Sequence, residues 1–135
     1  MFFNSYIILG RVSNFINSEL YGRETKLSWS VKFIKVDELN RHPSQIYEAI
    51  FEGLVLFIVL NYLYKKLSPQ SGLISALFLI LYSIFRFVIE FSREPDAQLG
   101  FVMMNFTMGQ LISVFTLLAG IYLYYLIYGK SNSSR

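Results

Sequence analysis

The sequence predicts an all-α membrane protein with three transmembrane helices and a polar N-terminal loop region. The chain of 135 residues is 54% hydrophobic and only 16% charged, well below the charged quarter of average soluble domains. Three apolar stretches, residues 46–64, 72–91 and 108–128, each approach the roughly 20 residues that a helix needs to cross a bilayer. Aromatic residues make up 18% of the chain, which is typical of spans with Tyr-rich interfacial belts.

The composition also excludes several classes of site. Without cysteine, the chain has no disulfide, no thiolate metal site and no thiol nucleophile of its own. A single histidine and dispersed carboxylates form no ligand set of recognisable spacing, so neither a metal nor a cofactor is expected. No basic cluster is dense enough to indicate a nucleic-acid partner. The net charge of +3 is compatible with contact to anionic lipid headgroups.

Residues 1–45 precede the first predicted span. Residues 1–9, MFFNSYIIL, are apolar but too short to span, and we expect them to be the end of a helix whose beginning is absent. Residues 10–45 are predicted to form a polar loop with an extended piece, WSVKFIKV, at residues 29–36. Ser44 is the expected N-cap of the helix that follows.

The three spans and their connections read as one membrane domain. Residues 65–71 form a short connector with a proline, residues 92–107 a longer loop, and residues 129–135 a polar tail. Three spans place the loops at residues 10–45 and 92–107 on the same membrane face. Basic residues flank both faces, so charge alone leaves the orientation open.

Charged side chains inside the predicted spans are the informative ones, because ionised groups are costly in a bilayer. Glu48 and Glu52 lie one helical turn apart in the first span. Arg86 and Glu90 have i,i+4 spacing in the second, so they share a face and can pair. In the third span Gln110 follows Gly109, which permits close helix approach. All of these lie near the span ends that meet the two polar loops.

Each of these residues also has a purely structural interpretation. Arg86 with Glu90 can be a buried structural pair, His42 a structural histidine at a helix entry, and Arg93 an interfacial arginine. Together, however, Arg11, Arg86 and Arg93 gather on one membrane face. Arginine is the preferred planar donor for phosphate, and lipid phosphates lie at this depth.

Four sequence blocks resemble one enzyme family. GRVSNFINSELYG at residues 10–22 resembles the signature G-R-x-[GA]-N-F-x-N-x-E-x-x-G of bacterial phosphatidylglycerol–prolipoprotein diacylglyceryl transferases. RHPSQIYEAIFEG, YSIFRFVIEFSREPD and FTMGQLIS, at residues 41–53, 82–96 and 106–113, follow in the family's order. The resemblance covers essentially the whole chain. Ser13 is a small departure from the Gly or Ala of the signature.

The resemblance implies a reaction and a location. A diacylglyceryl group would move from phosphatidylglycerol to the lipobox cysteine thiol of a preprolipoprotein, in a multi-pass protein of the bacterial inner (plasma) membrane. The site would face outward. It also implies a fold of seven helices, of which this chain would be the C-terminal part. The family's H-G-G block, with a histidine implicated in catalysis, is absent from this sequence, and His42 belongs to a different block.

Residue roles follow from the matched positions. The catalytic residues would be Arg86, beside the scissile bond, and Glu90, which would orient or neutralise it. The residues that would bind the phosphatidylglycerol headgroup are Arg11, Asn14, Glu19 and Arg93, and those expected around them are His42, Gln45 and Glu48. Two alternatives stay open. The chain can be an inactive truncated or split-gene fragment of the enzyme, or a small lipid-binding or transport subunit in which Arg86 and Glu90 form a gating pair.

Overall fold

The fold is described by a computed structural model over residues 3–67, 72–95, 101–103 and 106–133. Most of it is helical. The helices are α1 (Phe3–Asn17), α2 (Ser44–Glu48), the π-helix η1 (Ala49–Val55), α3 (Leu56–Leu67), α4 (Leu73–Ile89), the 3₁₀-helix η2 (Glu90–Ser92) and α5 (Met108–Ser133). The strands are β1 (Val31–Lys32), β2 (Asn40–Arg41), β3 (Phe101–Met103) and β4 (Phe106–Thr107).

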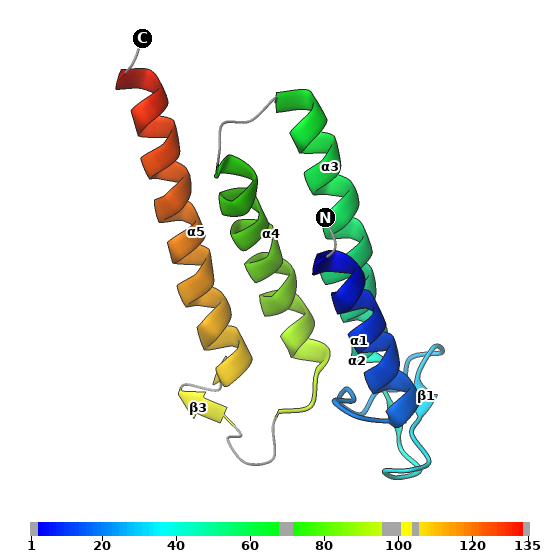
Figure 1. The fold of residues 1–135 in the computed structure, drawn as a ribbon. Helices are drawn as coiled ribbons and strands as arrows, with labels where there is room; N and C mark the ends of the chain where they lie inside the picture. The colour runs from blue at the N-terminus through cyan, green and yellow to red at the C-terminus, as the bar shows by residue number, and fades with distance from the viewer. Residues whose placement is uncertain (1–2, 68–71, 96–100, 104–105, 134–135) are drawn as a thin grey trace.

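Within the part of the chain that the structure describes, three helices are long and apolar enough to cross a membrane, as predicted. They comprise Ser44–Lys66, Leu73–Ser92 and Met108–Tyr128, with 23, 20 and 21 residues. The first is continuous through α2, η1 and α3. Figure 1 shows α4 between α5 and α3, with α1 beside the α2–α3 helix. Helices α1 and α4 end, and helices α2 and α5 begin, at the same end of the bundle, so the connecting loops gather there.

Helix α1 extends beyond the predicted boundary at residue 9 and includes most of the signature block. It ends at Asn17, where Ser18 adopts a left-handed conformation with φ of 62°. The amides of Ser18 and Glu19 donate to the carbonyls of Phe15 and Asn14 at 3.1 and 2.8 Å. This is a Schellman motif, a common helix terminus. The prediction of a loop from residue 10 onward was therefore wrong for residues 10–17.

The segment between α1 and α2 is mostly irregular. Only β1 within the predicted extended piece is a strand, and it pairs antiparallel with β2. The chain turns after β1 because Phe33 points inward, where it is 3% exposed and contacts the rings of Phe15 and Tyr21 at 5.6 and 6.1 Å. Ser44 is the first residue of α2 rather than its cap, and its hydroxyl donates to the Leu20 carbonyl at 3.2 Å.

The other connections differ in detail from the prediction. The loop at residues 92–107 contains the antiparallel pair β3–β4, and the predicted tail is helical as far as Ser133. Residues 68–71 of the predicted connector, 96–100 and 104–105 of the loop, and 134–135 of the tail lie outside the described residues.

Candidate functional site

Helix α1 and the continuous helix from α2 to α3 bury two carboxylates between them, at the end of the bundle where the connecting loops gather. Glu48 is the last residue of α2 and Glu52 lies in η1, and both are fully buried. Gly53 adjoins them, and a Cβ there would overlap the Ile8 side chain of α1. Because glycine allows α1 to approach this closely, Arg11 of α1 comes within reach of both carboxylates.

Three arginines from three different segments surround these carboxylates. Arg11 Nε lies 3.2 Å from Glu48 Oε2, and its Nη2 lies 3.8 Å from Glu52 Oε2. Arg86 of α4 pairs with Glu48 Oε1 and lies 3.6 Å from Glu52 Oε1. Arg93, just after η2, places Nη1 3.4 Å from Glu48 Oε1. Glu48 is thus shared by all three arginines that the sequence placed on this face.

Glu90 extends the network towards α5. Its Oε2 lies 3.1 Å from Arg86 Nη2, the pairing predicted from their i,i+4 spacing, and its Oε1 accepts a hydrogen bond from Thr107 Oγ1 at 2.9 Å. Gly109 makes room for this carboxylate, because a Cβ there would lie 2.5 Å from Glu90 Oε1. The Gln110 side chain accepts a hydrogen bond from the Thr107 amide at 3.0 Å and so fixes the start of α5.

A small backbone network holds Arg93 in place. The Gly22 amide donates to the His42 carbonyl at 3.1 Å, and the Arg23 amide donates to the Ser92 carbonyl at 2.9 Å. Arg23 Nε donates to the Arg93 carbonyl at 2.8 Å. The segment after α1 therefore links the residues before α2 to those after α4.

The cluster is costly for a membrane protein. Three acidic and three basic side chains lie together with little solvent exposure, the arginine side chains being only 10–20% exposed. Both oxygens of Glu52 are buried without a hydrogen bond among the described residues, although both have ion-pair neighbours. Buried pairs give little net stability because desolvation offsets their attraction. Such a cluster within membrane helices is therefore a functional-site candidate.

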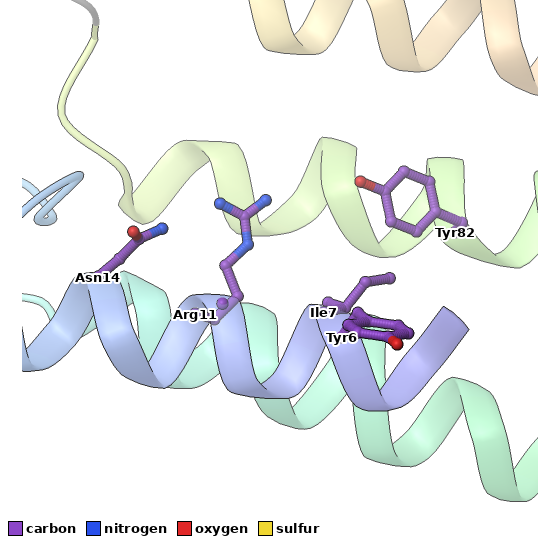
Figure 2. A pocket seen from close by; sticks show the side chains of 6 residues that line it. Tyr6, Ile7, Arg11, Asn14 and Tyr82 are labelled. Atoms are coloured by element: carbon purple, nitrogen blue, oxygen red, sulfur yellow. The ribbon is translucent and has the colours of Figure 1, made fainter. Parts of the chain in front are cut away.

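A pocket of about 300 Å³ opens beside this cluster between α1 and α4. Its lining comprises Tyr6, Ile7, Gly10, Arg11, Asn14 and Tyr82. Figure 2 shows Arg11 extending from α1 towards α4, with the Tyr82 hydroxyl turned in its direction. The pocket thus offers a guanidinium, an amide and a phenol beside apolar walls. Among the described residues no group of three histidine, cysteine or acidic side chains is placed so that it could hold a metal ion.

Three predicted site residues lie at the edge of this arrangement. Glu19 is exposed, and only its backbone carbonyl is used here: it accepts a hydrogen bond from Gln45 Nε2 at 2.6 Å. Gln45 is fully buried and so ties α2 to the end of α1. His42 faces Tyr47, with Nδ1 3.4 Å from the hydroxyl oxygen. Burial lowers the pKa of His42 below its ordinary value, which favours the neutral ring at pH 7.

Sequence reasoning left three residues out of the site. Glu52 was recognised as a charged residue inside the first span but not placed in the site, although its spacing from Glu48 puts both on one helix face. Tyr82 precedes Arg86 by four residues, and the same spacing rule could have identified it. Thr107 carried no such signal, because its contact with Glu90 depends on how the loop before α5 folds.

The sequence comparisons identify a family that this chain matches. The model of the prolipoprotein diacylglyceryl transferase family matches residues 5–126. The phosphatidylglycerol–prolipoprotein diacylglyceryl transferases of Rickettsia akari (strain Hartford) and Rickettsia bellii (strain OSU 85-389) are 53% and 54% identical over 119 residues. These alignments cover 87% of this chain and 46% and 45% of the two relatives, so the chain spans about half the length of the curated relatives it matches. The match over residues 5–126 confirms the resemblance of the four sequence blocks, and the chain belongs to the prolipoprotein diacylglyceryl transferase family.

Proposed function

We propose that this chain carries the phosphate-holding part of an enzyme that transfers a diacylglyceryl group from phosphatidylglycerol to the lipobox cysteine thiol of preprolipoproteins, the first step of bacterial lipoprotein maturation. One observation carries the proposal. Arg11, Arg86 and Arg93 come from separate segments and converge on buried carboxylates beside a pocket at one end of the spans. In this proposal the protein is a multi-pass protein of the inner membrane.

The proposed chemistry needs positive charge more than a protein nucleophile. The sulfur of the substrate thiol attacks the terminal glyceryl carbon of the diacylglycerol unit, a C–S bond forms, and the C–O bond to phosphate breaks. The leaving group is glycerol 1-phosphate, which takes up the thiol proton. Preorganised arginines stabilise the charge that develops on its phosphate oxygen.

The geometry supports a division of roles among the arginines. Arg11 lines the pocket and has the most exposed side chain of the three, at 20%, so it is the one best placed to meet an entering phosphodiester. Arg86 lies deeper, between Glu48, Glu52 and Glu90. Glu90 holds its guanidinium in a fixed orientation, which suits a residue placed at the scissile bond.

Arg86→Ala tests this assignment in membranes that contain phosphatidylglycerol labelled in its acyl chains and a lipobox peptide. The chain is produced together with the unmatched part of the Rickettsia akari relative, and label transfer to the peptide is measured. We expect the variant to abolish transfer while membrane insertion is unchanged. Lys65→Ala, an exposed residue at the opposite end of the bundle, is the matched control. Transfer by the Arg86→Ala variant at the control rate would refute the assignment.

The same assay separates a second candidate function. Because the chain spans about half the length of its relatives, a lipid-binding fragment without turnover is the alternative. The chain produced alone would then bind phosphatidylglycerol vesicles but transfer no label. We expect this result for the chain alone and transfer for the combined halves. Absence of transfer in both cases would favour the fragment.

A further inference from the structure

The segment between α1 and α2 exposes large apolar side chains beside lysines. Ile34 is 87% exposed and Trp29 is 59% exposed. We name this set the loop surface; its apolar members are Leu27, Trp29, Ile34, Val36 and Leu39, and its basic members are Lys26, Lys32 and Lys35, all exposed. Several large apolar side chains exposed on one short segment make it a candidate interaction site.

The outward direction of these side chains is built into the loop. Phe33, the residue between Lys32 and Ile34, is buried against Phe15 and Tyr21 and forms the small core of the segment. Its neighbours therefore point away from that core. The loop surface is a property of the folded segment, because any register that buried Ile34 would expose Phe33.

The position of the loop surface indicates that its binding partner is the lipid bilayer. The segment begins after α1, which ends at Asn17, and runs to Ser44, the first residue of a helix long and apolar enough to span a membrane. Trp29 Nε1 donates to the Tyr47 hydroxyl at 2.8 Å, and Tyr47 lies in the first turn of a 23-residue span. This bond holds the indole at the level where the span begins, which is the depth at which Trp and Tyr anchor membrane proteins.

The charges of the segment also fit a bilayer with anionic lipids. Residues 25–36 contain three lysines and no acidic residue. Glu24 and Asp37 flank this stretch, and Asp37 is held by Arg41 at 2.6 Å. Lysines beside exposed apolar residues are the composition of elements that lie in the membrane interface, and each lysine near an anionic leaflet is attracted to its headgroups.

We propose that the loop surface lies in the membrane interface, at the end of the bundle where the first span begins. Trp29, Leu27 and Ile34 insert at the boundary between headgroups and acyl chains, and the three lysines contact anionic lipid phosphates. This inference is independent of the transfer reaction, because it concerns how the segment rests on the membrane and uses none of the arginine cluster.

Trp29 is the only tryptophan of the chain and reports directly on this contact. The full chain is reconstituted in vesicles whose lipids carry bromine either near the ester carbonyls or near the ends of the acyl chains. We expect the shallow bromines to quench Trp29 fluorescence about twofold more strongly than the deep ones, as for an interfacial indole. Acrylamide added to the water should quench it weakly.

Two results would overturn the proposal. Strong acrylamide quenching without bromine quenching would place the loop surface in water. Weak quenching by both acrylamide and bromine would place it against protein, either a second copy of the chain or other parts of a longer protein.

The lysines are tested by the lipid composition and by charge reversal. Replacing neutral lipids by phosphatidylglycerol should strengthen shallow bromine quenching at low salt, and high salt should remove the gain. Lys32→Glu combined with Lys35→Glu should lose the same gain, whereas Lys65→Glu at the other end of the bundle should keep it. If the unmodified chain shows no dependence on anionic lipid or salt, the proposed lysine contacts are wrong whether or not the variants fold.

Discussion

Replacement of Glu48 by alanine removes the carboxylate that three arginines share. Arg11 and Arg93 lie 3.2 and 3.4 Å from its oxygens, and Arg86 pairs with it directly. Glu48 itself is fully buried. After the substitution, two carboxylates remain against three guanidinium groups, so the site carries one uncompensated positive charge.

The expected cost follows from this imbalance. Removing one partner of a buried ion pair destabilises a protein by about 3–5 kcal/mol, because the other charge stays buried without compensation. The arginine side chains keep 10–20% exposure and can draw in water, so we expect the lower end, about 3 kcal/mol. Glu48→Gln keeps the side-chain volume and removes the negative charge. If charge is the cause, this variant should be nearly as destabilised as Glu48→Ala.

The free energy of unfolding is measured by titrating detergent-solubilised protein with a denaturing detergent and following helix content. Glu38→Ala, at an exposed position, is the control and should stay within about 0.5 kcal/mol of the wild type. Arg93→Met added to Glu48→Ala restores the charge balance and should recover part of the lost stability. A Glu48→Ala variant as stable as the control, or a Glu48→Gln variant equal to wild type, would refute the electrostatic account.

Two further predictions concern Gly109 and Asp37. Gly109→Ala should destabilise the protein by about 1–3 kcal/mol through overpacking, because its Cβ would lie 2.5 Å from Glu90 Oε1; Gly10→Ala, with no neighbouring atom within 4 Å, should instead stabilise α1 in the same unfolding titration. The Arg41 hydrogen bonds lower the pKa of Asp37 below 3.8, so their stabilising effect is complete above that pH and is lost as the pH falls through the folded-state pKa. Trp29 fluorescence followed from pH 5 downward should show this loss, and Asp37→Asn should remove that acid-dependent step; an unchanged acid profile in Asp37→Asn would contradict it.

The spans and one ion pair were predictable because they depend on local spacing. A 20-residue apolar stretch reports a spanning helix whatever its neighbours are, and the i,i+4 spacing of Arg86 and Glu90 places their side chains on one face. Topology then brought both residues to the same end as Arg11. These predictions needed no knowledge of how the helices pack.

The end of α1 and the shape of the first span could not be predicted from local residue spacing. Asn14 and Asn17 are residues that turns favour, yet α1 packs on η1 and continues through Asn14 as far as Asn17. The left-handed residue that follows the helix is Ser18 rather than a glycine. The π-helical turn at Ala49–Val55 leaves no periodic signal in an apolar sequence. Such turns often occur at functional sites, and this one contains Glu52.

Long-range contacts explain why the site is more closely connected than its motifs suggest. Arg93 reaches Glu48 across 45 positions of the chain, and Arg23 donates to the Arg93 carbonyl across 70. Neither spacing has a sequence signature, because both depend on the loop between α1 and α2 folding against the end of α4.

This loop therefore has two roles that constrain each other. It positions Arg93 through Arg23, and it also carries the exposed apolar residues and lysines of the loop surface. If the loop surface rests in the membrane interface, the bilayer fixes the depth of the loop, and the loop in turn fixes the depth of Arg93. A phosphate-holding site must lie at the level of lipid phosphates. A loop anchored at that level would keep Arg93 at the same depth without further contacts.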